Sequence, residues 1–240
     1  MEQNSVENQG KNTDSKQIAG AIIIAGLIIA GAILLKGNQT VVSNNGNIPN
    51  NNGNPPQQQA GPLKPITSKD HIWGNSNAKI IVVEYSDFDC PFCKSFHVTM
   101  KQIVEKNNGK VAWIYRHFPL PQLHPNAFKK AESSECVAEL AGNDAFWKYA
   151  DKLFEGNPPT GLDKLPSLAG EIGLDVSRFT TCLSSGKYKS FVDTSIKEGS
   201  TAGVTGTPKS FIVKNGKVVD TINGAEPIDM VTQKIDAALK

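Results

Sequence analysis

The sequence predicts an α/β domain in which a small mixed sheet carries an all-helical insertion, preceded by a transmembrane helix and a disordered linker. The first observation is an uncharged run over 18–35 that contains only Ala, Gly, Ile and Leu. The second is a stretch over 37–65 dominated by Asn, Gln, Gly and Pro. The third is the order of the periodic segments in 66–240, which is β-α-β, a helical block and then β-β-α.

The composition excludes several classes of protein. Hydrophobic residues are 39% of the 240 residues and charged residues are 20%, so the chain can form a packed core and is not wholly disordered. The net charge of +2 excludes a nucleic-acid interface, which needs a clustered excess of Lys and Arg. Four cysteines are too few for a small scaffold held together by disulfides.

Residues 18–36 are predicted to form a transmembrane anchor in the lipid bilayer. As a helix, the uncharged run is about 27 Å long, close to the thickness of the hydrocarbon layer. Two lysines precede the run and one ends it, which favours a cytoplasmic location for the tail over 1–17. A cleaved signal peptide is the alternative, because the residues at 30–32 are small enough for a cleavage site. The run continues to Leu35, which favours an uncleaved anchor.

The linker over 37–65 is expected to tether one domain, residues 66–240, on the extracytoplasmic side, periplasmic or at the cell surface. Its composition cannot bury enough apolar surface to offset the entropy lost on ordering. In the domain, strands are expected at 79–86, 111–118, 210–213 and 217–222, and helices at 90–106, 126–141, 145–154, 166–172, 176–183, 190–200 and 227–239. The last two strands are separated by Asn215-Gly216, a strong hairpin signal.

The four residues Cys90-Pro91-Phe92-Cys93 form a CxxC motif between an expected strand and an expected helix. The N–H groups and the dipole at a helix N-terminus stabilise an anion, which favours the thiolate of Cys90. Pro91 suits the first helical position, where its missing N–H costs nothing. We therefore predict a lowered pKa for Cys90 and a near-normal or raised pKa for Cys93.

A zinc site and a purely structural disulfide are weaker interpretations of the CxxC motif. A zinc site usually draws its four ligands from two short-spaced pairs. The remaining two cysteines are single and far apart, and the four histidines show no paired spacing, so we expect no metal site. A purely structural disulfide across a CxxC motif is geometrically tight.

Several ordered motifs give the domain a resemblance to a known family. The segment 83–88 (VEYSDF) precedes the CxxC motif, and the segments 116–120 (RHFPL), 124–127 (HPNA) and 203–208 (GVTGTP) follow it. Together with the order of elements, they make the chain resemble the DsbA-like thiol–disulfide oxidoreductases of the thioredoxin superfamily over about 70–240. The resemblance implies a thioredoxin-like fold with a helical insertion at about 126–200.

The resemblance implies a role for each residue that matches a family motif. Cys90 corresponds to the nucleophilic cysteine and Cys93 to the resolving one. Thr207-Pro208 corresponds to a loop whose cis-proline packs beside the two sulfurs, with the backbone of Thr207 free to pair with an extended substrate chain. An ordinary trans proline in a turn is the alternative, since cis bonds before proline are uncommon.

Pro91 and Phe92, between the cysteines, are also expected to contact the substrate. Phe92 supplies neither charge nor hydrogen-bond donor, unlike the histidine of the archetypal strong oxidase of the family. Threonine before Pro208 also occurs in reductases and isomerases of the superfamily. The direction of electron flow therefore stays open. Isomerases of the superfamily commonly need a dimerisation module, and the anchor helix is the one candidate for it, so an isomerase ranks below an oxidase.

Glu84 lies in an otherwise apolar strand segment, before the CxxC motif. A buried carboxylate is costly unless it is paired or protonated. In the family, an acid at this place assists proton transfer at the resolving cysteine, and a protonated carboxyl can serve as that acid. The alternative is an acid at a solvent-facing strand end.

Cys136 and Cys182 both lie in expected helices of the insertion. In an oxidising compartment two lone cysteines in one subdomain most simply pair, and some members of the family have a second pair. That disulfide would contribute on the order of 4 kcal/mol. Two free buried thiols and a second redox relay are the alternatives.

We therefore expect a membrane-tethered oxidoreductase that forms disulfides in unfolded or reduced exported proteins. Exchange needs no dissociable cofactor, because the electrons reside in the cysteine pair. The resemblance implies a membrane partner that reoxidises Cys90 and Cys93. A reductase or isomerase of the same fold and a non-catalytic tethered chaperone or binding module are the alternatives.

Overall fold

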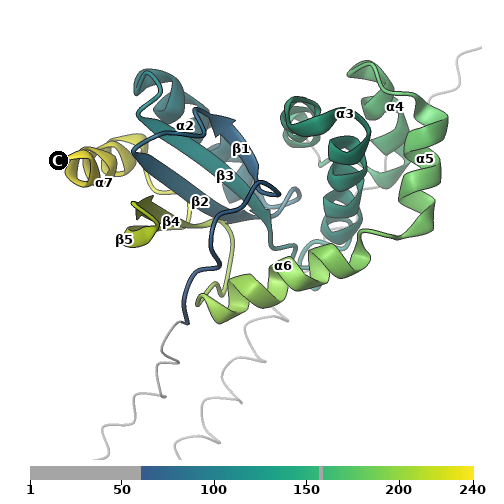
Figure 1. The fold of residues 1–240 in the computed structure, drawn as a ribbon. Helices are drawn as coiled ribbons and strands as arrows, with labels where there is room; N and C mark the ends of the chain where they lie inside the picture. Colours follow the sequence, from purple (N-terminus) through teal and green to yellow (C-terminus); the bar gives the residue numbers. More distant parts are fainter. Residues whose placement is uncertain (1–60, 157–158) are drawn as a thin grey trace, which may run out of the picture. The chain divides into compact units, whose positions relative to one another are not determined.

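The computed structural model describes residues 61–156 and 159–240, which form a five-stranded mixed sheet flanked by helices (Figure 1). The strands are β1 (His71–Gly74), β2 (Ile80–Ser86), β3 (Val111–His117), β4 (Lys209–Lys214) and β5 (Lys217–Asn223). They lie in the order β1-β3-β2-β4-β5. Strands β2 and β3 are parallel, and the other three neighbouring pairs are antiparallel.

A helical crossover and a tight hairpin build this sheet. Helix α2 (Pro91–Lys106) connects β2 to β3, because a parallel pair needs a crossover connection. Strands β4 and β5 are joined through Asn215-Gly216, where φ is 52° at Asn215 and 74° at Gly216. Positive φ at both positions is the conformation that an Asn-Gly hairpin turn favours. The hairpin expected from the sequence is confirmed.

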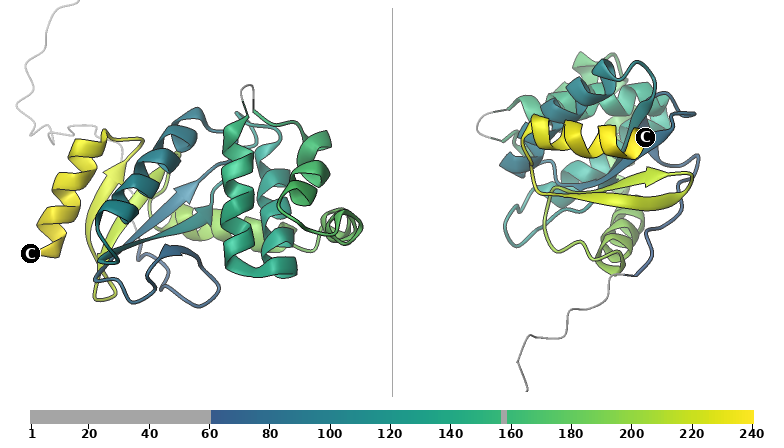
Figure 2. Two further views of the ribbon diagram at one scale, coloured as in Figure 1. Left: turned by 90° about the horizontal axis from the view of Figure 1, so that it is seen from above. Right: turned by 90° about the vertical axis from the view of Figure 1, so that its left-hand side faces the viewer.

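The two faces of the sheet pack against different helices. Val82 belongs to the larger core, together with side chains of α2 and of α7 (Ile228–Leu239). The next residue, Val83, belongs to a smaller core beside the C-terminal end of α6 (Lys189–Thr201). Neighbouring residues of a strand point to opposite faces, so both faces of β2 are covered. Figure 2 shows α7, in yellow, alongside the β4–β5 hairpin.

A helical insertion separates β3 from β4. It contains α3 (Ala127–Glu155), the short η1 (Leu162–Lys164), α4 (Leu165–Glu171), α5 (Val176–Ser185) and α6. The two helices expected at 126–141 and 145–154 form the single element α3, with a break at Gly142, whose φ is 79°. The described residues therefore form a small mixed sheet with an all-helical insertion, as the sequence predicts.

The structure also differs from the sequence-based expectations at the start of the domain. Strand β1 is not predicted by the sequence, because four residues are too short to show a clear alternation. Residues 61–65 belong to the domain rather than to the linker. The backbone N–H of Gly61 donates to the carbonyl of Thr201 at 2.7 Å, and Lys64 forms an ion pair with Glu198 at 2.6 Å.

The predicted cytoplasmic tail (1–17), the predicted anchor (18–36) and the rest of the predicted linker lie outside the described residues. Across 61–156 and 159–240, no helix combines the length and the apolar character that a membrane span requires.

Candidate active site

The first cysteine of the CxxC motif caps a helix. Cys90 occupies the N-cap position of α2, and Pro91 follows in the first turn. The side chains of both cysteines are buried, with 5% of Cys90 and 0% of Cys93 exposed. Both are free thiols, so the structure shows the reduced form of the pair.

The two thiols have opposite pKa shifts. The pKa of Cys90 is lowered to about 6, first by a hydrogen bond from the Cys93 side chain, which outweighs the opposing effect of burial. The backbone N–H groups of Phe92 and Cys93 lower it further. The pKa of Cys93 is raised well above its ordinary value, chiefly by burial and then by its hydrogen bond to Cys90. At neutral pH, Cys90 is the thiolate and Cys93 the thiol.

The loop before β4 closes the site from the other side. The peptide bond between Thr207 and Pro208 is cis. In its thiol form, Cys90 donates from Sγ to the carbonyl oxygen of Thr207 at 3.4 Å. The fold therefore joins the CxxC motif to a loop 117 residues away in the chain.

An apolar hollow lies beside the nucleophilic sulfur. A cavity of about 260 Å³ is lined by Cys90 and Pro91 together with aromatic and aliphatic side chains, among them Phe88, Leu153 and Phe154. Phe92, between the cysteines, is 64% exposed. Together they present apolar surface next to the Cys90 thiol, and Asp89 and Lys94 complete the cavity wall.

Glu84 is a buried acid behind the cysteines. It lies on β2 with 1% of its surface exposed, and the indole Nε1 of Trp113 donates to its Oε2 at 2.8 Å. Burial raises its pKa to about 8, and the nearby Cys90 charge adds to this shift. The negative charge of Glu84 in turn raises the pKa of Cys93.

A buried polar network that sequence reasoning missed holds the loop before Cys90. Asp87 is 1% exposed, and its Oδ1 accepts from the backbone N–H of Asp89 at 2.8 Å. Its Oδ2 accepts from the backbone N–H of Leu120 at 2.9 Å and lies 2.8 Å from Nδ1 of His124. Asp89 forms an ion pair with the fully buried Lys130 of α3. In the sequence, the network is indicated only by the two carboxylates just before the CxxC motif, Asp87 and Asp89. Their other partners lie more than 30 residues further along the chain.

The second pair of cysteines lies in the insertion. Cys136 of α3 and Cys182 of α5 form a disulfide with a Cα–Cα distance of 5.8 Å. Both residues lie in the interior of their helices, so neither has the helix N-terminus that Cys90 has.

Comparisons with known proteins agree with this geometry. A family model described as thioredoxin matches residues 67–235. Curated relatives include the Na⁺/H⁺ antiporters NhaA 1 of Mycolicibacterium vanbaalenii, 33% identical over 118 residues (49% of this chain), and NhaA 3 of Salinispora tropica, 30% identical over 156 residues (65% of this chain). The matches cover 18% and 23% of these antiporters, so the chain spans about a fifth of their length.

Solved structures of two bacterial proteins are similar over most of the domain. DsbA2 of Pseudomonas aeruginosa is 25% identical with a TM-score of 0.60, covering 72% of this chain and 96% of that one. BdbD of Bacillus subtilis, in its oxidised form, is 23% identical with a TM-score of 0.63, covering 75% of this chain and 98% of that one. The chain thus belongs to the thioredoxin family, and its described residues have the fold of these DsbA-type structures.

Proposed function

We propose that this protein is a DsbA-like thiol–disulfide oxidoreductase, anchored in a membrane through residues 18–36, that forms disulfides in exported proteins. Residues 1–17 are its cytoplasmic tail, 37–60 are its linker, and 61–240 are its extracytoplasmic catalytic domain. Its substrates are unfolded or reduced exported proteins.

The opposite pKa shifts of the two cysteines carry the proposal. With a pKa of about 6, Cys90 is about 90% thiolate at pH 7, whereas an ordinary cysteine is only a few per cent ionised. Stabilising that thiolate lowers the free energy of the reduced pair. A pair with a stabilised reduced form is an oxidant, because its disulfide accepts electrons readily.

The reaction begins with the oxidised enzyme. A substrate thiolate attacks Sγ of Cys90, the Cys90–Cys93 bond breaks, and its electron pair leaves on Cys93. Cys93 then takes up a proton, because its pKa lies well above neutral pH. A second substrate thiolate attacks the substrate sulfur of the mixed disulfide and releases Cys90 as a thiolate. The substrate has lost two electrons, and the enzyme holds them as a dithiol.

Glu84 is the proposed proton source for Cys93. Because its pKa is about 8, it is protonated at neutral pH and can donate when the sulfur of Cys93 becomes an anion. Proton uptake at Cys93 prevents the leaving thiolate from attacking Cys90 again. The mixed disulfide then persists long enough for the second substrate thiol to react.

Pro91, Phe92, Thr207 and Pro208 are the proposed substrate-binding residues. Pro91 lines the apolar cavity beside Cys90, and Phe92 extends that apolar surface outward. The backbone of Thr207, within 3.4 Å of Cys90 Sγ, lies where an extended substrate strand joined to that sulfur would pass. A membrane partner that accepts two electrons must reoxidise the pair after each turnover.

The oxidase activity is tested with a peptide that contains two thiols. The oxidised full-length chain should convert the peptide to its disulfide, and Cys90→Ser should reduce the rate to that of the uncatalysed reaction. Cys136→Ala/Cys182→Ala is the matched control and should keep the rate within about twofold. An unchanged rate for Cys90→Ser contradicts the proposal. If the Cys90→Ser/Cys93→Ser variant still holds unfolded peptides as well as the native chain, the chain is a binding module instead.

A disulfide reductase is the second candidate, and Phe92 is the observation that favours it. This side chain supplies no charge or donor to stabilise the thiolate further. Two rates are compared: the reduced enzyme reducing a disulfide peptide, and the oxidised enzyme oxidising the corresponding dithiol peptide. If the first rate is the higher, the protein is a reductase.

A further inference from the structure

A second group of buried ionisable side chains lies away from the reactive cysteines. His71 comes from β1, His117 from β3 and Glu135 from α3. Their exposed fractions are 9%, 2% and 5%. Nε2 of His71 and Nε2 of His117 each lie 2.7 Å from the same atom, Oε1 of Glu135. Three elements therefore direct two imidazoles and one carboxylate at a single point.

This set has the composition and the spacing of a transition-metal site. One ligand atom of each residue lies within 4.8 Å of the other two. Zinc binds histidine nitrogen at about 2.0–2.1 Å and carboxylate oxygen at about 2.0–2.2 Å, so ligands of a tetrahedral ion lie roughly 3.3 Å apart. Each Nε2 atom now lies 2.7 Å from Oε1 of Glu135. A movement of the carboxylate by about half an ångström away from the imidazoles gives the ligand spacing of a tetrahedral ion. Two histidines and one glutamate are also an established ligand set of zinc sites that keep a fourth position open.

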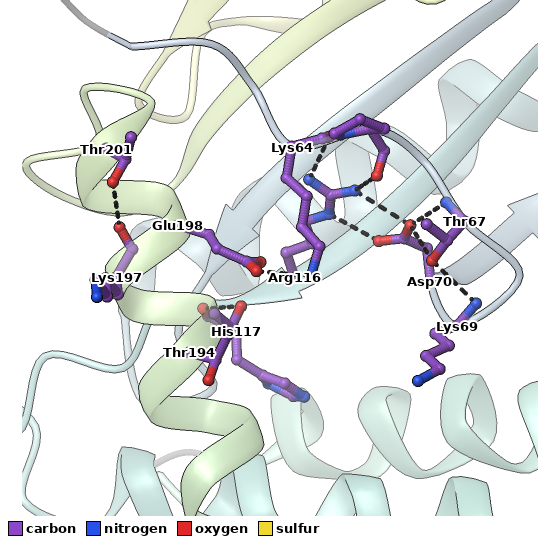
Figure 3. Close-up of polar contacts among 12 residues, drawn as sticks. Lys64, Thr67, Lys69, Asp70, Arg116, His117, Thr194, Lys197, Glu198 and Thr201 are labelled. Atoms are coloured by element: carbon purple, nitrogen blue, oxygen red, sulfur yellow. Dashed lines mark hydrogen bonds and ion pairs between the residues drawn. The ribbon is translucent and has the colours of Figure 1, made fainter.

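A cavity next to the three side chains provides that fourth position. It has a volume of about 340 Å³, and His71, His117 and Glu135 all line it. Figure 3 shows His117 projecting from β3 into the space between α6 and the segment with Lys69 and Asp70. A water molecule can therefore reach an ion held by the three ligands.

The other charges of the cavity wall leave Glu135 available to a cation. Arg116 pairs with Asp70, with 2.7 Å between Nε and Oδ1, and Lys64 pairs with Glu198 at 2.6 Å (Figure 3). Lys69 is exposed. In each of these two pairs the positive and the negative side chain neutralise one another. Within the described residues, the ion-pair partners of Glu135 are instead the imidazoles of His71 and His117.

We propose that His71, His117 and Glu135 bind one divalent transition-metal ion of the zinc class, with water from the cavity as the fourth ligand. The ion joins β1 and β3 to the insertion through α3, and so stabilises the docking of the insertion on the sheet. This departs from the expectation of no metal site, which considered only paired spacing. The three ligands are 46 and 18 residues apart and meet only in the folded chain.

Zinc titration of the full-length chain tests this site, with Cys90–Cys93 kept oxidised so that no thiolate competes for the metal. Isothermal titration calorimetry should give one Zn²⁺ per chain, and Zn²⁺ should raise the melting temperature. His117→Gln and Glu135→Gln should each lower the affinity at least tenfold. His97→Gln is the matched control, because His97 is a buried histidine paired with another carboxylate, Asp151, at 2.6 Å; it should keep the stoichiometry and the affinity.

A second measurement uses the unaltered chain, so it does not depend on the variants folding. X-ray absorption at the zinc edge should show only nitrogen and oxygen neighbours, with the scattering pattern of two imidazoles. The proposal is overturned if no stoichiometric binding occurs, if sulfur neighbours are found, or if His97→Gln weakens binding as much as His117→Gln.

Discussion

The two cysteine pairs of the chain lie in different halves of the fold and have different surroundings. Cys90 and Cys93 lie at the start of α2, just after the central strand β2 and beside the cis-proline loop, and they are free thiols. Cys136 and Cys182 lie within two helices of the insertion and form a disulfide. The same chemical group is therefore a titrating thiol in one half and a covalent cross-link in the other.

The comparison shows that position, more than cysteine content, decides reactivity. Cys90 gains hydrogen bonds from Cys93 and from backbone N–H groups at a helix N-terminus, and these stabilise its thiolate. A sulfur in a helix interior has no free backbone N–H within reach, because those groups are bonded to carbonyls one turn earlier. The predictions below separate the two roles, beginning with the largest expected effect.

Removing the disulfide of the insertion should cost the most stability. The Cys136→Ala/Cys182→Ala variant loses a cross-link over 46 residues, so its free energy of unfolding should fall by about 4 kcal/mol. Reducing the Cys90–Cys93 disulfide should instead raise the free energy of unfolding, because the Cys90 thiolate stabilises the reduced form. Urea unfolding measures both changes, and a fall of similar size on reducing Cys90–Cys93 would remove the distinction between the pairs.

Breaking the buried ion pair between the two halves should be the next largest effect. Lys130→Met leaves the carboxylate of Asp89, which is 8% exposed, without its buried partner. We expect a loss of about 3 kcal/mol in the free energy of unfolding. Lys189→Met is the matched control, since Lys189 forms an exposed pair with Asp193; its free energy of unfolding should hardly change, because water screens the pair. Equal losses for the two variants would show that the buried pair has no special role.

The pH dependence of stability should identify Glu84. Its pKa is raised from the ordinary value to about 8, so its contribution to stability is complete below the ordinary pKa and is lost as pH rises through about 8. Glu84→Gln cannot ionise. The free energy of unfolding of the variant should therefore rise relative to that of the native chain between about pH 4.5 and about pH 8, and the difference should be constant above that range. A constant difference between the two proteins across this range would contradict a buried, protonated Glu84.

The smallest predicted effect concerns the residue between the reactive cysteines. Phe92 is 64% exposed, so a charge placed there is screened by solvent. Phe92→His should raise the reduction potential of Cys90–Cys93 by roughly 10 to 30 mV, because a protonated imidazole favours the thiolate. The same substitution should leave the midpoint of urea unfolding of the chain unchanged. A fall in the potential would mean that Phe92 affects the site through packing rather than through charge.

Local patterns predicted most of the fold. The β-branched run before the CxxC motif, the Asn215-Gly216 turn and the spacing of apolar residues in α2 and α7 each contain their own signal. Strand β1 was missed because four residues carry too little periodicity, and its pairing with β3 depends on residues about 40 positions away. The start of the domain was placed too late because Leu63 packs on the core from within a polar, proline-containing segment.

The site was predictable where its chemistry is local and was missed where it is not. Cys90, Pro91, Phe92 and Cys93 are contiguous, and the motif itself indicates the helix N-terminus. The pairing of Lys130 with Asp89 spans 41 residues, and His71 meets Glu135 across 64. Such contacts form only when the insertion docks on the sheet, so no spacing rule in the sequence indicates them.

The reduction potential of Cys90–Cys93, measured on the full-length chain in equilibrium with glutathione, tests the central claim most directly. Disulfide formation as the function predicts a potential near about −120 mV, as for a strong oxidant. The lowered pKa of Cys90 shifts the potential in that direction, because it stabilises the reduced form. A potential near roughly −270 mV, typical of a thioredoxin-like reductant, would contradict disulfide formation as the function of this enzyme.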